Sequence, residues 1–185
     1  MADQEIIIGV SGGVSAYKTA ALTSQLVQKG YGVRVALTAA ARKFVGPATF
    51  AALTGRPVCG DAFDAEAYPL GPHIELARAS DLLCVAPATA DFLARAAGGL
   101  ADDLLSTLYL GFTGPVIMAP AMNCEMWDKP AVQRNVEQLR EDGVQMVGPN
   151  QGWLSCRDRG VGRMAEPAEL FDAINDIMNP GPRSS

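Results

Sequence analysis

The stretch Ile6-Ile7-Ile8-Gly9-Val10-Ser11-Gly12-Gly13 passes from an apolar run into a serine and two glycines. An apolar run rich in β-branched residues is typical of a strand that is covered on both faces. A helical pattern follows over about residues 14–29, and Gly30 ends it. The stretch therefore predicts the strand, loop and helix with which a parallel sheet begins.

Strands and helices continue to alternate along the chain. Further buried strands are predicted over residues 33–37, 82–86, 115–119 and 144–147. Helical patterns cover residues 39–44, 47–55, 90–97, 104–110, 130–141 and 166–178, whereas residues 55–72 and the loop 152–162 lack a clear period. We therefore expect an α/β fold, a single-domain doubly wound parallel sheet of the Rossmann-like type, over residues 1–178. The Pro/Gly/Ser-rich residues 179–185 are expected to form a disordered tail.

The composition argues against several classes of protein. With 185 residues, 49% of them hydrophobic, the chain can bury a core as one domain. A formal net charge of −5 disfavours a nucleic-acid or anionic-membrane partner. No apolar run approaches the ~20 residues of a membrane span, and the acidic N-terminus is not expected to be a signal peptide.

The cysteine and histidine content bears on metal binding and location. Four widely spaced cysteines, without a C-x-x-C pair, indicate free thiols in an intracellular protein: Cys59, Cys84, Cys124 and Cys156. A single histidine excludes a histidine-rich metal site, so no metal is expected. We expect a cytoplasmic location.

Several loops should open on one rim of this sheet, because ligands of doubly wound sheets bind beyond the carboxyl ends of the strands. The loops in question are Ser11-Gly12-Gly13, Thr38 and residues 87–90 and 120–123. The first loop matches neither G-x-G-x-x-G nor G-x-x-x-x-G-K-[ST], which disfavours NAD and ATP. Small residues before a helix N-terminus suit a mononucleotide phosphate such as that of FMN. A tight, serine-capped turn without a ligand is the alternative.

His73 is the only histidine and follows Gly71-Pro72. A lone histidine is more often without a chemical duty than catalytic. Arg78 lies five residues further, which we interpret as near the same helix face, and its guanidinium could bind a carboxylate or phosphate in a bidentate manner. The alternative for Arg78 is an exposed ion pair with Glu75 or Asp81.

Asn123 and Cys156 each have an ordinary structural explanation beside a functional one. Asn123 suits a helix N-cap, and its neighbours Met122, Met126 and Trp127 suit a core. Cys156 could be a small buried hydrophobe. However, the arginines and glycines around Cys156 indicate a mobile, exposed loop that could close over a site, and guanidinium groups favour a thiolate.

Three segments together resemble one known family. They are Pro120-Ala121-Met122-Asn123-x-x-Met126-Trp127, His73-Ile74-Glu75-Leu76, and Cys156 before Gly160-x-Gly162-Arg163-Met164-Ala165-Glu166-Pro167. They resemble the flavin-dependent cysteine decarboxylases, most of all the branch that acts on 4′-phosphopantothenoylcysteine in coenzyme A biosynthesis. The segment Ala101-Asp102-Asp103-Leu104-Leu105-Ser106-Thr107 is similar to a flavin-contacting segment of that family. The resemblance covers about residues 5–178.

The resemblance implies an FMN-binding flavoprotein fold and a role for each matching residue. The residues implied to contact FMN are Gly12, Gly13, Ser15, Thr38, Ala88, Thr89, Ala90, Asp91, Asp103 and Ala121. Those implied to contact the substrate are Arg78, Asn123, Met126 and Gly160, and the implied catalytic residues are His73, Asn123 and Cys156. The implied reaction oxidises the substrate thiol to a thioaldehyde, releases CO2 and reduces the resulting ene-thiol, with Cys156 as the proton donor. Enclosure would protect the thioaldehyde from water.

The chain departs from the family pattern beside its thiol. Ser155-Cys156-Arg157 stands where the family often has Ala-Cys-Gly, and the loss of the glycine changes the freedom of the backbone. Three other functions stay open. The chain could be a peptidyl-cysteine decarboxylase that modifies a peptide C-terminus, or a flavin-binding regulatory protein without catalysis. A flavin prenyltransferase is less consistent with the motifs. The resemblance also implies a homotrimer, sometimes assembled into a dodecamer with FMN between subunits. In many bacteria this domain is fused to a phosphopantothenate–cysteine ligase; here we expect either that the ligase is a separate protein or that the sequence is a fragment.

Overall fold

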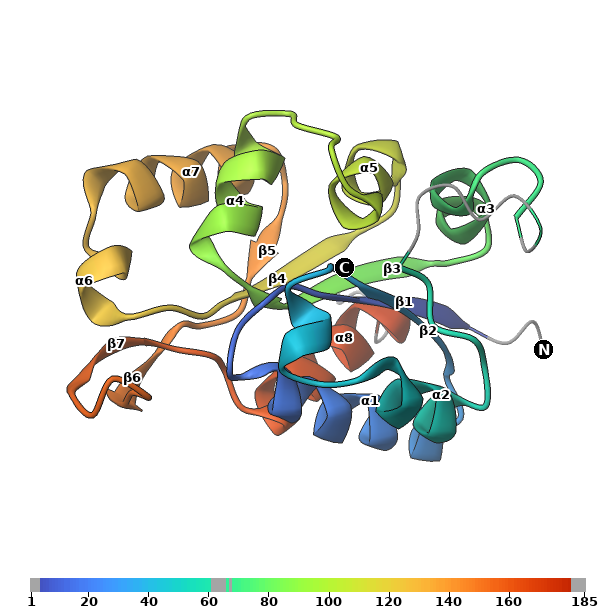
Figure 1. The fold of residues 1–185 in the computed structure, drawn as a ribbon, viewed down its shortest axis with the longest axis horizontal. Coiled ribbons are helices and arrows are strands. Elements are labelled where there is room, and N and C mark those ends of the chain that lie inside the picture. Colours follow the sequence, from blue (N-terminus) through green and yellow to red (C-terminus); the bar gives the residue numbers. More distant parts are fainter. Residues whose placement is uncertain (1–3, 61–65, 67, 181–185) are drawn as a thin grey trace, which may run out of the picture.

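The computed structural model describes residues 4–60, 66 and 68–180, and its centre is a parallel sheet with strand order β2-β1-β3-β4-β5 (Figure 1). The strands are β1 (Glu5–Val10), β2 (Gly32–Leu37), β3 (Leu82–Ala88), β4 (Val116–Pro120) and β5 (Gln145–Met146). All four pairings between neighbours are parallel. The predicted doubly wound α/β fold is confirmed.

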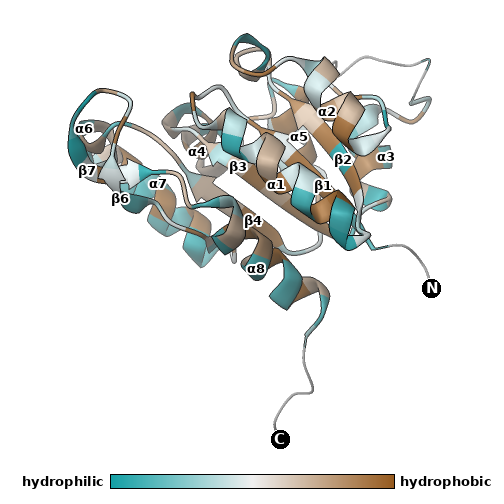
Figure 2. Ribbon diagram, turned by 90° about the horizontal axis from the view of Figure 1, so that it is seen from below, coloured by the Kyte–Doolittle hydropathy of each residue, from teal (hydrophilic) through white to brown (hydrophobic). Residues whose placement is uncertain are grey.

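Helices cover both faces of the sheet (Figure 1). On one face lie α1 (Ala16–Lys29), α2 (Pro47–Thr54) and α8 (Pro167–Met178). On the other lie α3 (Pro72–Arg78), α4 (Ala90–Ala97), α5 (Leu104–Gly111) and α7 (Pro130–Glu141). Figure 2 shows α1 and α8 in front of strands whose residues are mostly hydrophobic. The direction in which the chain winds through the sheet reverses between β1 and β3, and this leaves a crevice at the carboxyl ends of these two strands.

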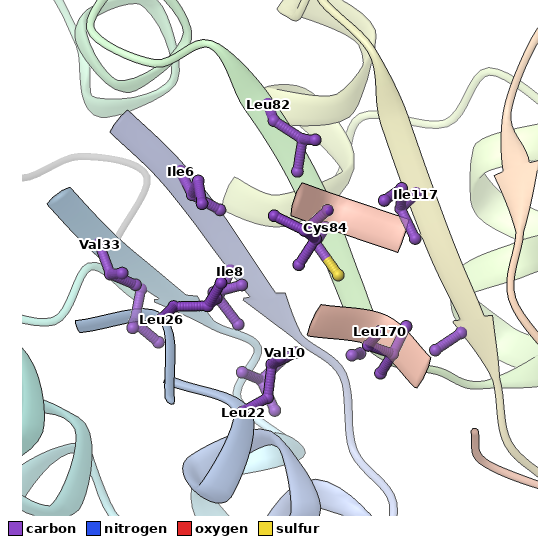
Figure 3. Close-up of a cluster of buried hydrophobic side chains, with 14 of the residues drawn as sticks. Ile6, Ile8, Val10, Leu22, Leu26, Val33, Leu82, Cys84, Ile117 and Leu170 are labelled. Atoms are coloured by element: carbon purple, nitrogen blue, oxygen red, sulfur yellow. The ribbon is translucent and has the colours of Figure 1, made fainter. Parts of the chain in front are cut away.

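Both faces of the central strands are buried, which explains why their sequences are apolar throughout. Ile6, Ile8 and Val10 of β1 pack toward α1 and α8, whereas Ile7 packs toward the opposite helices, and all four side chains are fully buried. Cys84 lies among them (Figure 3). Burial raises the pKa of the Cys84 thiol to about 12, so it stays protonated and unreactive at neutral pH.

Two connections differ from expectation. The helix predicted over residues 39–44 is a single 3₁₀ turn, η1 (Ala41–Lys43), whose first N–H donates to Thr38 Oγ1 at 3.1 Å. A short helix, α6 (Cys124–Trp127), follows β4. Its start was one alternative considered for Asn123, but its extent was not predicted, because four residues are too few to show a helical period.

The segment predicted as a mobile loop over residues 152–162 is an antiparallel hairpin. Its strands are β6 (Asn150–Trp153) and β7 (Arg159–Arg163). The connection is a β-turn in which the Arg157 N–H donates to the Leu154 carbonyl, and the Leu154 N–H donates to the Asp158 carbonyl, both at 2.9 Å. Hairpins with three-residue loops take this form, with the third loop residue left-handed. The glycines and arginines had concealed the alternation of a strand pair.

The chain end is partly described. Residues 181–185 of the predicted disordered tail lie outside the described residues, whereas Asn179 Nδ2 donates to the Tyr31 hydroxyl at 2.7 Å. Among the helices that the structure describes, none has the length and apolar character needed to cross a bilayer. The cytoplasmic location stays a prediction.

Candidate functional site

A cavity of about 860 Å³ lies at the carboxyl ends of β1 and β3, where the winding of the sheet reverses. Its walls come from the loop after each of these strands, the segments after β2 and β4, and the β6–β7 hairpin. Twelve residues predicted from the sequence line it: Gly12, Gly13, Ser15, Thr38, Thr89, Ala90, Asp91, Asp103, Ala121, Asn123, Met126 and Cys156. Segments distant in sequence thus form one site.

The loop between β1 and α1 offers unused donors to the cavity. The N–H groups of Gly12, Gly13 and Ser15 donate to no acceptor within the described part of the chain. Ser15 is the N-cap of α1, and its hydroxyl caps no backbone N–H. Helix N-termini carry partial positive charge and free N–H groups, so this end of α1 suits a phosphate.

Close packing behind this loop requires a residue without a side chain. A Cβ on Gly12 would lie 2.4 Å from the Ala40 Cβ, closer than carbon atoms approach. The buried Ser11 ties the loop to the next strand, because its hydroxyl donates to the Pro87 carbonyl at 2.7 Å and accepts from the Thr89 N–H at 3.0 Å. The loop is therefore held in place before any ligand arrives.

Three polar lining residues already serve the backbone. Thr38 accepts the first N–H of η1, Thr89 caps α4, and Asp103 caps α5 by accepting from the Ser106 N–H at 2.7 Å. Their side chains fix the helix ends that face the cavity. The capping box of Asp103 and Ser106 gives the segment over residues 101–107 a structural role beside any contact with a ligand.

Asn123 caps a helix and also faces the cavity. Its Oδ1 accepts the Glu125 N–H at 2.7 Å, so it is the N-cap of α6. The same side chain lines the cavity. Because the cap engages the oxygen, the Nδ2 group is left without a partner among the described residues, and it can donate to a carboxylate.

Cys156 lies at the tip of the hairpin and lines the cavity while also being exposed. Arg157, the next residue, has φ +68° and is the one non-glycine residue with positive φ in the described ranges. A left-handed conformation costs an L-residue roughly 1–2 kcal/mol. The turn therefore keeps the backbone shape that a glycine would favour, and the thiol keeps its place beside the cavity.

Four predicted residues are not among those that line the cavity. Ala88 is fully buried at the end of β3, where its carbonyl accepts from the Ala121 N–H. Gly160 faces α6, and a Cβ there would lie 2.7 Å from the Cys124 Cβ. His73 and Arg78 are on α3, and Figure 1 places this helix at the opposite end of the molecule from the hairpin.

The geometry of α3 also corrects one detail of the sequence interpretation. Five residues along an α-helix turn by roughly 140° beyond a full circle. His73 and Arg78 therefore point to different sides of α3, rather than near the same face. The assignment of His73 as catalytic and Arg78 as substrate-binding stays a prediction.

Three charged residues of the cavity wall were missed: Lys18, Arg95 and Arg163. Lys18 has a side chain that is only 8% exposed, Arg95 belongs to α4, and Arg163 belongs to β7. One signal was available for Lys18, since positions three apart on a helix share a face and Ser15 was already a candidate. Nothing in the sequence indicated the position of Arg163, because the hairpin had been interpreted as a loop.

Comparison with known proteins identifies related chains. A family model described as Flavoprotein matches residues 1–179. A relative named coenzyme A biosynthesis bifunctional protein CoaBC, from Haemophilus influenzae, is 43% identical over 176 residues. The match covers 95% of this chain and 44% of that relative, so the chain spans less than half of the relative's length.

Two solved structures share the fold closely. The FMN-dependent cysteine decarboxylase SpaF superimposes with a TM-score of 0.83 and 36% identity, over 96% of either chain. A cysteine-to-serine mutant of PPC decarboxylase complexed with pantothenoylaminoethenethiol superimposes with a TM-score of 0.83 and 30% identity, over 94% of this chain and 97% of that one.

Proposed function

The chain belongs to the Flavoprotein family, and we propose that it is an FMN-dependent lyase that decarboxylates 4′-phosphopantothenoylcysteine to 4′-phosphopantetheine. The observation that carries this proposal is the position of Asn123 and Cys156 on one cavity at the β1/β3 crevice. Relatives named for coenzyme A biosynthesis and solved cysteine decarboxylases support the choice of substrate class. The Asn123 amide and the Cys156 thiol suit a cysteine carboxylate and its neighbouring carbon.

The cavity fits FMN in its shape and its donors. A doubly wound sheet of order 2-1-3-4-5 binds a flavin mononucleotide at the same crevice in flavodoxin-like proteins. The free N–H groups of Gly12, Gly13 and Ser15 would hold the phosphate, and the volume suits a ligand of this size. When bound, FMN would accept two electrons from the thiol-bearing carbon of the substrate and return them after CO2 has left.

Asn123 would hold the substrate carboxylate through Nδ2. Its Oδ1 is engaged by the Glu125 N–H, so the amide cannot rotate without breaking the cap of α6. A donor fixed in this way orients the carboxylate without paying the full entropy of ordering it. Met126, which also lines the cavity and is half exposed, would pack against the apolar part of the substrate.

Cys156 would donate the proton that completes the reduction of the ene-thiol. The hairpin that carries it forms one wall of the cavity, with Leu154 buried behind the turn. A substrate under this wall would be shielded from water while its thioaldehyde exists. Because Cys156 is exposed in the absence of substrate, solvent can reprotonate its thiolate after each turnover.

His73 would act in the site of a neighbouring subunit. It does not line the cavity of its own chain, whereas Val14 and Tyr17, which do line it, leave apolar side chains exposed by 53% and 63%. Such apolar surface is costly in water and favours an assembly that covers it. We include in the proposal a homo-oligomer, a trimer or a dodecamer, in which His73 and Arg78 complete the next subunit's site.

A second candidate is a decarboxylase that acts on the cysteine of a peptide. The likeness to SpaF, whose name states cysteine decarboxylation and not the coenzyme A substrate, favours it. Both candidates use the same cavity residues.

The deciding experiment compares two substrates. Purified protein loaded with FMN is incubated with phosphopantothenoylcysteine and, separately, with a peptide ending in cysteine, and CO2 release is measured. Turnover of the first substrate supports the proposal, and turnover of the peptide alone supports the second candidate. Turnover of neither rejects both. A Cys156→Ser variant should release CO2 but accumulate the ene-thiol, detected by mass spectrometry.

Subunit mixing tests the shared site. Neither His73→Asn nor Cys156→Ser protein should complete the reaction alone. If His73 serves the neighbouring site, co-refolding the two variants restores part of the full activity, because some sites then contain both native residues. If each site is built from one chain, the mixture stays as inactive as its components.

A further inference from the structure

Lys18 and Glu166 connect the first turn of α1 to the base of the β6–β7 hairpin. Lys18 Nζ donates to Glu166 Oε1 at 2.9 Å and to the Met164 carbonyl at 3.0 Å. Arg163, the last residue of β7, donates to the same Glu166 oxygen. One carboxylate therefore holds both a helix of the main sheet and the end of a hairpin strand.

The other hairpin strand, β6, is held by the N-terminus of α8, whose N-cap is Glu166. Asn150, the first residue of β6, donates through Nδ2 to Glu169 Oε2 at 2.7 Å. The same Glu169 oxygen accepts the Glu166 N–H at 2.7 Å, which forms the capping box of α8. Both strands of the hairpin are thus tied to the N-terminus of α8, and Lys18 ties that terminus to α1.

The environment of Lys18 makes this connection more than an ordinary surface ion pair. The side chain is only 8% exposed, and an unpaired ammonium group would be costly there. It also lies in the first turn of α1, where the helix dipole disfavours a cation. The two acceptors that compensate for this, the Met164 carbonyl and Glu166, both belong to the segment that leaves the hairpin.

The hairpin needs an external hold. An isolated pair of strands is at most marginally stable in water, and β6 and β7 pair only with each other. The hairpin also contacts the body of the protein along β7, through Gly160 and Gly162, which lie against Cys124 and Met122. The orientation of Cys156 over the cavity then depends both on this contact and on how the base is fixed.

We propose that Lys18 is a positioning residue, which acts through Glu166 to hold the hairpin so that Cys156 faces the substrate. This inference rests on the proposed function for its catalytic consequence, but not for its structural one. Without Lys18, substrate oxidation and CO2 loss should continue, because Asn123 is carried by another segment. The final protonation by Cys156 should fail more often.

The test uses Lys18→Met in the FMN-loaded protein, with Lys29→Met as its matched control. Lys29 is an exposed lysine in the last turn of the same helix. The products are the ene-thiol and the fully reduced thiol, which carries two more hydrogen atoms, and mass spectrometry separates them. Dissolved dioxygen reoxidises the flavin after each aborted turnover, so the ene-thiol can accumulate.

We expect the ratio of ene-thiol to full product to rise about tenfold in Lys18→Met and to stay unchanged in Lys29→Met. A change of this size corresponds to the loss of one charge-assisted hydrogen bond. Asn150→Ala, which releases the other strand, should shift the ratio in the same direction. If the ratio is unchanged in both Lys18→Met and Asn150→Ala, the proposal is overturned. So does loss of FMN from Lys18→Met in proportion to activity, because Lys18 would then be a cofactor ligand.

Hydrogen exchange separates this proposal from the proposed function. Amides of β7 should exchange about tenfold faster in Lys18→Met than in Lys29→Met, whether or not the wild type decarboxylates any substrate. If the wild type is inactive but β7 loosens, the proposed function fails and the anchoring role stands. If β7 exchange is unchanged in Lys18→Met and in Asn150→Ala, the anchor is wrong. A melting scan with bound FMN identifies a variant that has not folded.

Discussion

The Met122 N–H donates to the Gly162 carbonyl at 2.9 Å, and this bond joins the segment after β4 to the hairpin. The two residues pack so tightly that a Cβ on Gly162, whose φ is +146°, would lie 2.3 Å from the Met122 carbonyl oxygen. Asn123 and Cys156 are carried on the two sides of this junction. Their relative position is set where two short segments touch.

Substitution of Gly162 should separate the two sides of the site. Gly162→Ala forces the hairpin away from Met122, so we expect kcat/KM to fall by at least roughly a hundredfold, the effect of displacing a positioned group. Gly111→Ala is the control, since a Cβ at Gly111 meets no atom within 4 Å. Equal activity of the two variants, measured as CO2 release, would contradict the junction's role.

Two adjacent glycines should respond differently to alanine. Gly12→Ala meets Ala40 at 2.4 Å and should lower the melting temperature of the FMN-free protein. Gly13→Ala makes only ordinary contact, 3.5 Å to Thr89 Cγ2, and should melt like the wild type while binding FMN more weakly. Thermal unfolding and a flavin fluorescence titration measure these two effects. If both variants bind FMN as tightly as the wild type, this loop is not part of the cofactor site.

Asn123→Asp should separate the cap from the donor. Aspartate retains an oxygen for the Glu125 N–H, so unfolding should be unchanged, whereas Asn123→Ala should lose about 1 kcal/mol of stability. The carboxylate of the variant cannot donate and repels the substrate carboxylate, so kcat/KM should fall roughly a hundredfold. Wild-type turnover by Asn123→Asp, assayed beside urea unfolding, would exclude the proposed contact.

Arg157→Gly should make the hairpin tip more stable. The left-handed φ of +68° is unfavourable for arginine and free of this penalty for glycine. We expect the Leu154 amide, which donates to the Asp158 carbonyl, to exchange several-fold more slowly, corresponding to about 1 kcal/mol. Arg157→Ala keeps the Cβ and should show no gain. A matching gain in Arg157→Ala would attribute the effect to the side chain instead.

The Glu5 carboxylate should make stability depend on pH. Hydrogen bonds from Arg56, at 2.5 and 2.8 Å, hold the pKa of Glu5 below its ordinary value of 4.5. Because the folded pKa is depressed, this stabilisation is complete above pH 4.5 and is lost as pH falls through the folded value. Glu5→Gln should therefore be less stable than the wild type at neutral pH, by roughly 1.5 kcal/mol. The difference should shrink in acid, and urea unfolding at several pH values would reveal a constant difference if the linkage is absent.

Local sequence patterns were sufficient for the elements of the main sheet. The apolar run of β1 and the period of α1 depend on residues close in the chain, so both were predictable. The hairpin was not, because Gly152, Gly160 and Gly162 hide its alternation. Its strand β7 packs against Met122 and Cys124, which belong to a different segment of the sequence.

The candidate site divides along the same line. The sequence by itself determined the strand–loop–helix order, and therefore which loops meet at one rim, because parallel strands must end on the same edge. It also marked Asn123 and Cys156 through their segments. Only the tertiary structure decided that Lys18 and Arg163 share Glu166, that Arg157 is left-handed, and that His73 lies away from its own chain's cavity. These depend on the packing of distant segments in three dimensions, which no local period encodes.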